Sequence, residues 1–254
     1  YTTPMKEPHF FACPEVKDTY YDVSFVDDLD EYAALFEDAG DTQKAGDFSP
    51  SYIYRTQAAH RIHRHCPDAL ILMILRDPVE RAISHYLMDV RGGYNEESLM
   101  DCLTKEDDSL RRYYREYVEV GRYTTQVNEY KSVFGKDNMK ILLFDDLKSS
   151  AEEMMIEIEK FLGIKKSKKI NVNKKHNRHA KLESKIIDKI NRSRVGKYLK
   201  MVMPERSKGV IGKYLFSESK PEFREERSML REIFESEIQE MQNLINRDVS
   251  HWSS

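Results

Sequence analysis

The feature that most constrains the fold is an uninterrupted apolar run, Ala69–Leu75, followed at once by the start of a helix. A run of this kind, with no polar alternation, predicts a strand that is buried on both faces, as in parallel sheets. Asp77 is a good helix N-cap, and Pro78 stands at the first helical position, where its missing N–H costs nothing. Apolar residues then recur at the spacing of one helix face as far as Val90. The sequence therefore predicts a strand, a tight turn and a helix.

Arg76 lies in the turn between this strand and this helix. Ligands of α/β sheets bind at the carboxyl ends of strands, and anions favour helix N-termini. Arg76 is therefore a candidate anion-binding residue. The alternative, with equal support from the local sequence, is that Arg76 only pairs with Asp77 or Glu80 at the helix end.

Composition excludes several classes of protein. The formal net charge is −3 over 254 residues, so the overall electrostatic footprint of a nucleic-acid-binding protein is absent. No apolar run reaches the roughly 18 residues that a membrane-spanning helix needs. Three scattered cysteines do not form a disulfide framework. His60 and His63 have the spacing of metal ligands on a helix, but no third ligand accompanies them, and we expect no metal.

The string RDPVERAISHY, from Arg76 to Tyr86, closely resembles the 3′-phosphate-binding segment of sulfotransferases that use 3′-phosphoadenosine-5′-phosphosulfate (PAPS). In that family an Arg at the strand end and a Ser eight residues later hold the 3′-phosphate, and here these are Arg76 and Ser84. The resemblance implies an α/β fold, with a P-loop-like parallel sheet flanked by helices and a helical C-terminal extension. It also implies PAPS as co-substrate, adenosine 3′,5′-bisphosphate as product, and no metal.

A second segment, KEPHFF from Lys6 to Phe11, resembles the segment after the first helix in the heparan-sulfate-type and bacterial branches of this family. There the Glu is the general base on the acceptor hydroxyl and the His assists, which implies these roles for Glu7 and His9. Two residues apart on an extended segment, both side chains lie on one side, and a positioned carboxylate or imidazole can remove a hydroxyl proton. The alternative is a surface loop with a buried Phe pair.

In the family, a first strand, a K-x-G-T-T phosphate loop and a helix precede this segment, and none of them lies between Tyr1 and Lys6. Either these elements precede Tyr1 in the full protein, or the protein lacks the 5′-phosphosulfate site. The first alternative is favoured because a parallel sheet without its central strand would leave the Ala69–Leu75 strand with an open edge.

The other expected elements follow from caps, periodicity and resemblance. We expect a short strand and turn in Gln43–Tyr54, where Asp47 replaces the family's acid and Phe48 stands where some members have a catalytic Lys. Two helices meet at Gly121, and Ser150 begins a capping box. The remaining expected helices are Asp28–Ala39, Thr56–Cys66 with Ala59, Ile62 and Cys66 facing inward, Leu110–Val120, Tyr123–Phe134, Lys181–Lys200, Glu205–Phe216 and Pro221–Ile245, and the second buried strand is Met139–Phe144.

Lys165–Lys181 holds eight Lys and Arg residues and no acid. The family's loop at this place folds over the 3′-phosphate and adenine, which implies cofactor-binding roles for Lys175 and Arg178. We expect one domain over residues 1–254, with an α/β core in 1–164 and a basic loop and helices in 165–254. A basic run of this kind is otherwise a solvated loop.

The function implied is transfer of a sulfuryl group from PAPS to a hydroxyl or amine of a carbohydrate or small-molecule acceptor. The bacterial-type resemblance implies a cytoplasmic protein without a nucleic-acid partner, and a homodimer stays open. One alternative is a nucleotide-dependent kinase of similar architecture, with Asp145 and Asp146 as Mg²⁺ ligands. Another is a degenerate relative that binds an anionic polymer through Lys165–Arg194.

Overall fold

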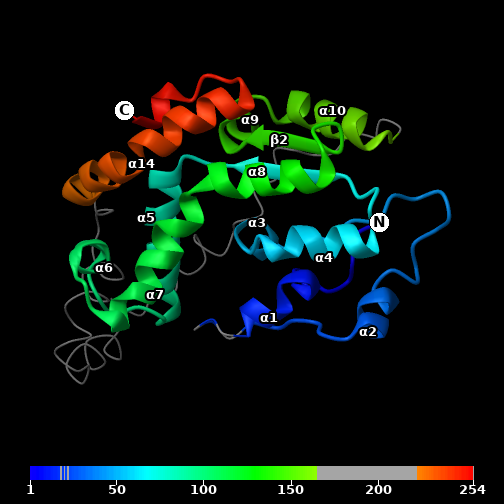
Figure 1. Ribbon diagram of the computed structural model, residues 1–254, viewed down its shortest axis with the longest axis horizontal. Helices are drawn as coiled ribbons and strands as arrows, with labels where there is room; N and C mark the ends of the chain where they lie inside the picture. The colour runs from blue at the N-terminus through cyan, green and yellow to red at the C-terminus, as the bar shows by residue number, and fades with distance from the viewer. Residues whose placement is uncertain (18, 20, 22, 165–221, 254) are drawn as a thin grey trace, which may run out of the picture.

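The computed structural model describes residues 1–254 except 18, 20, 22, 165–221 and 254 (Figure 1). The described elements are two parallel strands, which are separated by a run of helices, and further helices before and after them. In chain order they are η1 (Phe10–Ala12), α1 (Cys13–Val16), α2 (Leu29–Ala34), α3 (Ser51–Tyr54), α4 (Gln57–His65), β1 (Ile71–Leu75), α5 (Pro78–Gly92), α6 (Leu99–Thr104), α7 (Asp108–Tyr117), η2 (Glu119–Gly121), α8 (Tyr123–Phe134), β2 (Met139–Leu143), α9 (Phe144–Ser149), α10 (Ala151–Leu162), α14 (Arg224–Ile245) and η3 (Ser250–Ser253).

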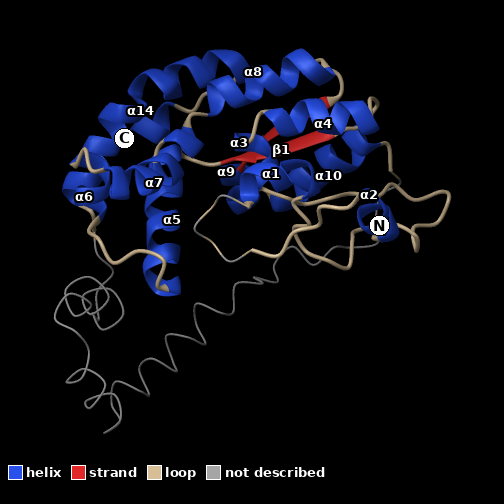
Figure 2. Ribbon diagram, turned by 60° about the horizontal axis from the view of Figure 1, so that its bottom comes forward, coloured by secondary structure: helices blue, strands red, loops and turns tan. Residues whose placement is uncertain are grey.

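The sheet of the described residues has two strands, β1 and β2, which run parallel (Figure 2). Their register pairs Ile71 with Met139 and Leu75 with Leu143. The expected strand is therefore present, but it is not buried on both faces. Ile74, in the middle of β1, is 46% exposed, because no described residue covers its face or pairs with the other edge of the strand.

The turn after β1 forms as its sequence predicts. The Asp77 carboxylate accepts hydrogen bonds from the backbone N–H groups of Val79 and Glu80, at 2.8 and 3.3 Å. Pro78 is the first residue of α5. The expected apolar face of this helix is buried at Val79, Ala82, Ile83, Tyr86 and Val90. Burial of the Asp77 carboxylate raises its pKa, against the opposing effect of the two backbone hydrogen bonds.

The core lies between α5 and the helices around it. Helices α5, α6 and α7 gather at one end of the molecule, and α14 packs against both α5 and α8 (Figure 1). The apolar face of α14 buries Leu230, Phe234, Ile238 and Met241. Its Glu237 carboxylate accepts from the backbone N–H and the hydroxyl of Thr124, at 2.6 Å each, which satisfies donors in the first turn of α8.

Several local expectations are wrong. Helix α2 covers only Leu29–Ala34, shorter than expected and without a fully buried residue, although its Tyr32 stacks on Phe10. Gln43–Tyr54 contains helix α3 and a single bridge from Gly46 to Thr2 instead of a strand. Cys66 follows the end of α4 and is exposed. Ser150 precedes α10, but its side chain makes no capping hydrogen bond.

The long C-terminal helix begins at Arg224 instead of Pro221, and the expected helices Lys181–Lys200 and Glu205–Phe216 lie outside the described residues. Helices α7 and α8 and strand β2 confirm the predictions for their segments to within two or three residues. In the part of the chain that the structure describes, no helix is long and apolar enough to cross a membrane.

Candidate active site

Glu7 and His9 lie close together before η1. The Glu7 Oε2 and His9 Nε2 atoms are 3.9 Å apart, and the Lys6 ammonium is 3.0 Å from Glu7 Oε1. The backbone is not the extended segment that the sequence analysis assumed, because both residues have left-handed φ angles, 59° at Glu7 and 54° at His9. Such angles cost non-glycine residues roughly 1–3 kcal/mol each and concentrate at functional sites. The two side chains nevertheless meet.

A partly buried hydrogen-bond network, from α2, α3 and the turn before α3, holds this strained segment. Asp47 is its centre and accepts from the hydroxyls of Ser49, Tyr52 and Tyr32, at 2.7, 2.6 and 3.0 Å. The Ser49 hydroxyl oxygen in turn accepts from the backbone N–H of His9 at 3.0 Å. We call Asp47, Ser49, Tyr52 and Tyr32 the Asp47 network. It fixes the backbone of His9 from residues about 40 positions further along the chain.

The imidazole of His9 is itself buried, with 8% of the residue exposed. Its Nδ1 atom lies 2.7 Å from the hydroxyl oxygen of Ser51, the first residue of α3. Burial lowers the pKa of His9, and the nearby charges of Glu7 and Asp47 act in the opposite direction. Because the net effect is a lowered pKa, His9 is a neutral imidazole at neutral pH.

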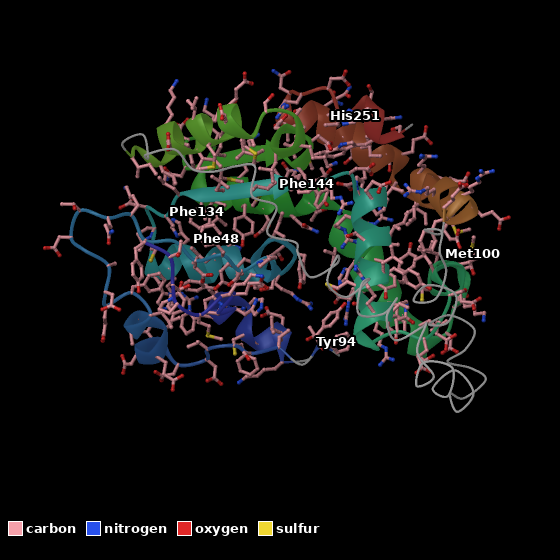
Figure 3. The ribbon with its side chains drawn as sticks, turned by 180° about the vertical axis from the view of Figure 1, so that it is seen from behind. Phe48, Tyr94, Met100, Phe134, Phe144 and His251 are labelled. Atoms are coloured by element: carbon pink, nitrogen blue, oxygen red, sulfur yellow. The ribbon has the colours of Figure 1, made fainter. Side chains whose placement is uncertain are left out.

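Phe48 points away from this network. It is 63% exposed, and its ring lies over Gly46, at 3.7 Å from the Cβ position that an alanine there would have (Figure 3). No cation therefore stands at the position where some relatives have a catalytic lysine. Among the described residues of this corner, Lys6 is the cation in contact with Glu7.

Arg76 lies at the carboxyl end of β1, beside the first residue of α9. Since Leu75 pairs with Leu143 in the parallel register, Arg76 and Phe144 come next to each other, and the guanidinium carbon lies 5.4 Å from the Phe144 ring centroid. The Lys148 ammonium approaches the same ring at 4.9 Å. The Nε atom of Arg76 is buried and has no hydrogen-bond partner among the described residues.

The alternative role considered for Arg76 is also present, in a weak form. Arg76 Nη2 lies 3.8 Å from Glu80 Oε2, while the same carboxylate accepts a hydrogen bond from Arg227 of α14. The Arg227 hydrogen bond lowers the pKa of Glu80; desolvation opposes this, and the charges of Arg76 and Lys148 add to it. Glu80 is thus surrounded by three cations, and its pairing with Arg76 leaves the Nε–H of Arg76 unused.

Ser84 lies two turns into α5 and is half-buried. Its hydroxyl makes no hydrogen bond to any residue that the structure describes. Arg76 and Ser84 therefore both present unused donors, and an anion with several oxygens fits this chemistry. Lys175 and Arg178, the other expected cofactor-binding residues, lie outside the described residues.

Tyr54 is acted on by the charges of both Glu7 and Arg81. It lies at the end of α3, and burial raises its pKa to about 12, with the charges of Glu116, Arg55, Arg81 and Glu7 also acting on it. Arg81 belongs to α5, the helix that carries Ser84, and donates to the backbone carbonyls of Glu116 and Tyr117.

Asp145 and Asp146, the magnesium ligands of the kinase alternative, are already engaged. Both oxygens of Asp146 accept from the Arg247 guanidinium, at 2.6 and 2.8 Å. Asp145 accepts from Lys148, Trp252 and His251, which together lower its pKa to about 2 despite the opposing effect of burial. No group of three metal-ligating side chains is found in the described part of the chain. His60 instead contacts Glu129 at 2.7 Å.

Sequence reasoning named Glu7, His9, Arg76 and Ser84 as site residues, but not their partners Ser51, Glu80, Arg227 and Phe144. The contacts join residues up to 147 positions apart, so no local spacing could indicate them. One signal was available for Ser51. Ser51 directly follows the Ser49-Pro50 turn, which resembles a family motif, and the structure shows that its hydroxyl is buried.

Comparison with known proteins identifies the family to which the chain belongs. A model of the sulfotransferase family matches residues 4–168, so the chain belongs to the sulfotransferase family. The solved structure of a sulfotransferase from Alicyclobacillus acidocaldarius is similar over 100% of this chain and 88% of that one, with a TM-score of 0.71 and 26% identity. The α/β sulfotransferase fold is thereby confirmed.

Two curated relatives match a shorter segment of 80 residues. Both are named heparan sulfate glucosamine 3-O-sulfotransferase 6, one from Mus musculus at 38% identity and one from Homo sapiens at 35%. Each match covers 32% of this chain and 20% of the relative. The chain therefore spans about one fifth of the length of the curated relatives that it matches.

Proposed function

We propose that this sulfotransferase takes a sulfuryl group from PAPS and transfers it to a hydroxyl or amine of a carbohydrate or small-molecule acceptor. The observation that carries the proposal is the pair of unused donors after β1, the buried Nε–H of Arg76 and the hydroxyl of Ser84. A guanidinium just before α5 and a hydroxyl two turns into this helix match the oxygens of the donor's 3′-phosphate. The names of the two curated relatives favour a carbohydrate hydroxyl.

When it is bound, PAPS supplies the activated sulfuryl group and leaves as adenosine 3′,5′-bisphosphate. Arg76 and Ser84 would hold the 3′-phosphate, with Phe144 supporting the Arg76 guanidinium from one side. Lys175 and Arg178 stay predicted donor-binding residues. Glu7 would accept the proton of the acceptor hydroxyl, and His9 would assist it from 3.9 Å away. Residues 1–254 as one domain, the homodimer and the cytoplasmic location stay predictions.

The two alternative functions differ from sulfuryl transfer in their need for Mg²⁺ or in their binding of the nucleotide. A kinase would need Mg²⁺, but its candidate ligands Asp145 and Asp146 are held by Lys148, Trp252 and Arg247. A degenerate polymer-binding relative would not bind the nucleotide at all. Neither alternative uses the unpaired donors of Arg76 and Ser84.

The test is a calorimetric titration of adenosine 3′,5′-bisphosphate into the full-length protein and into Arg76→Ala. Losing a charge-assisted phosphate contact costs about 1.5–3 kcal/mol, so affinity should fall by about 10- to 150-fold. Ser84→Ala should show a smaller loss because a neutral hydroxyl contributes less. Transfer of labelled sulfate from PAPS to a panel of polysaccharide and small hydroxyl acceptors then tests the reaction.

Arg91→Ala is the matched control. Arg91 lies at the end of the same helix, is exposed, and donates only to the Leu87 carbonyl among the described residues. Its loss should leave the affinity unchanged. Equal affinities of wild type and Arg76→Ala would overturn the donor site, and phosphoryl transfer that depends on Mg²⁺ would favour the kinase.

A further inference from the structure

The two ring nitrogens of His9 face groups of different hydrogen-bonding capacity. Ser51 Oγ lies 2.7 Å from Nδ1, and Glu7 Oε2 lies 3.9 Å from Nε2. Ser51 is 2% exposed and His9 8%, so the contact between them is shielded from water. The two residues are 42 positions apart in the sequence. This contact raises the question of which nitrogen carries the proton.

A neutral imidazole has one N–H donor and one nitrogen that only accepts. A serine hydroxyl can donate or accept, whereas an ionised carboxylate only accepts. If Nδ1 carried the proton, the lone pair of Nε2 would face the negative charge of Glu7. If Nε2 carries it, Nε2–H points at Glu7 and the Ser51 hydroxyl donates to Nδ1. In the second arrangement Nδ1 accepts the Ser51 hydrogen bond and the Nε2–H dipole, not a lone pair, faces the carboxylate, and the lowered pKa of His9 agrees with a neutral ring.

We propose that Ser51 is a positioning residue of the active site: its hydroxyl donates to Nδ1 of His9 and so directs Nε2–H at Glu7, which leaves Glu7 as the only proton acceptor of the pair. This rests on the proposed function, in which the proton of the acceptor hydroxyl passes to the Glu7 carboxylate. His9 cannot take that proton in this arrangement, because the lone pair of its ring is already engaged by Ser51.

The surroundings of His9 make this arrangement rigid. Ser51 begins α3, and the backbone N–H of His9 donates to Ser49 two residues earlier. The charged groups that face the ring are Glu7 and Asp47, and Lys6 pairs with the far oxygen of Glu7. At 3.9 Å the Nε2–H group is too far for a hydrogen bond and acts as a dipole aimed at the carboxylate.

The direct test is nitrogen NMR of the full-length protein with ¹⁵N-labelled histidine, with the His9 signals identified by their absence in His9→Asn. The shifts report for each ring nitrogen whether it carries a proton. We expect Nε2 of His9 to be protonated and Nδ1 unprotonated at neutral pH. A protonated Nδ1 would overturn the proposal. This measurement needs neither donor nor acceptor, and it does not depend on any variant of Ser51.

Ser51→Ala provides the second measurement. Without the hydroxyl, both tautomers of His9 should become populated. Turnover should fall by about tenfold, less than the roughly 10²–10⁴-fold expected for loss of the base itself. The affinity for adenosine 3′,5′-bisphosphate should not change. Ser132→Ala removes an exposed serine hydroxyl that, among the described residues, donates only to the Glu129 carbonyl, and it should leave turnover and tautomer unchanged.

The outcomes separate the inference from the proposed function. A folded Ser51→Ala protein that keeps a single Nε2–H tautomer would overturn the role of Ser51, whatever its activity. The expected tautomer in a protein that transfers no sulfuryl group would refute the proposed function, while the hydrogen bond from Ser51 to His9 would stand. Sulfuryl transfer by a protein in which Nδ1 of His9 is protonated would support the proposed function and overturn the role of Ser51.

Discussion

At the scale of single residues, the Glu7 carboxylate is the proposed general base. Glu7→Gln keeps the shape of the side chain but cannot accept a proton, so turnover should fall by roughly 10²–10⁴-fold while donor affinity stays near normal. Steady-state kinetics with PAPS, together with the nucleotide titration, measure both quantities. Glu7 is 33% exposed at its side chain and remains accessible to an acceptor.

His9→Ala is the comparison for this prediction. It should reduce turnover less than Glu7→Gln, because the ring orients the base without taking the proton. If His9→Ala abolished turnover while Glu7→Gln stayed near wild type, the two roles would be reversed. If neither substitution reduced turnover, the acceptor would bind elsewhere, and the roles proposed for Glu7 and His9 would be wrong.

At the scale of elements, Gly121 of η2 lies in the tight packing between α14 and the first residue of α5. A Cβ atom on Gly121 of η2 would lie 2.8 Å from Phe234 Cζ and 3.4 Å from Pro78 Cβ. Phe234 is fully buried and cannot move away freely. Gly121→Ala should therefore lower the free energy of unfolding by about 1–3 kcal/mol, the usual effect of overpacking, as measured by urea denaturation.

The double variant Gly121→Ala/Phe234→Leu checks the mechanism. If the new methyl group clashes with the Phe234 ring, the two destabilising effects should not add, because a smaller side chain makes room. Gly40→Ala, whose Cβ would meet only Gln43 at 3.6 Å or more, is the control and should change little. Full additivity, or an unchanged urea midpoint for Gly121→Ala, would contradict the packing described.

The sequence predicted individual helices and strands better than it predicted the tertiary contacts between them. The strand, cap and helix from Ile71 to Gly92 follow from signals within a few residues, such as Asp77 before Pro78. The strand expected before Tyr54 is absent because Asp47, Ser49 and Tyr52 bond to each other and to the N-terminal segment, which favours a compact turn. The contact of Ser51 with His9 depends on tertiary structure and has no local signal.

At the scale of the whole molecule, a buried histidine couples folding to pH. His85 of α5 contacts the Tyr21 hydroxyl at 2.7 Å and Arg81 Nη1 at 3.2 Å. Burial, and then the charge of Arg81, lower its pKa to about 4, with Asp89 opposing. The unfolded chain has a pKa near its ordinary value of 6.5, so it binds more protons than the folded protein between these values.

Stability should therefore be full above about pH 6.5 and fall as the pH drops from about 6.5 to about 4, by at most about 3.4 kcal/mol from this residue. Urea unfolding at intervals between pH 7.5 and 4.5 measures the loss. His85→Gln should flatten the dependence in this window. His60→Gln, at an exposed histidine, should leave it in place. A wild-type protein equally stable at pH 7 and pH 5 would contradict the prediction.

The open edge of β1 has a practical consequence for anyone preparing residues 1–254 at the bench. Apart from β2, no described strand pairs with β1, and Ile74 in its middle is 46% exposed. Among the described residues this edge is unpaired and carries an exposed apolar side chain, which is a template for another chain, so we expect solutions of this polypeptide to oligomerise as they are concentrated. Ile74→Lys should delay that association in sedimentation velocity runs, since a charge on such a strand disfavours stacking of a second copy.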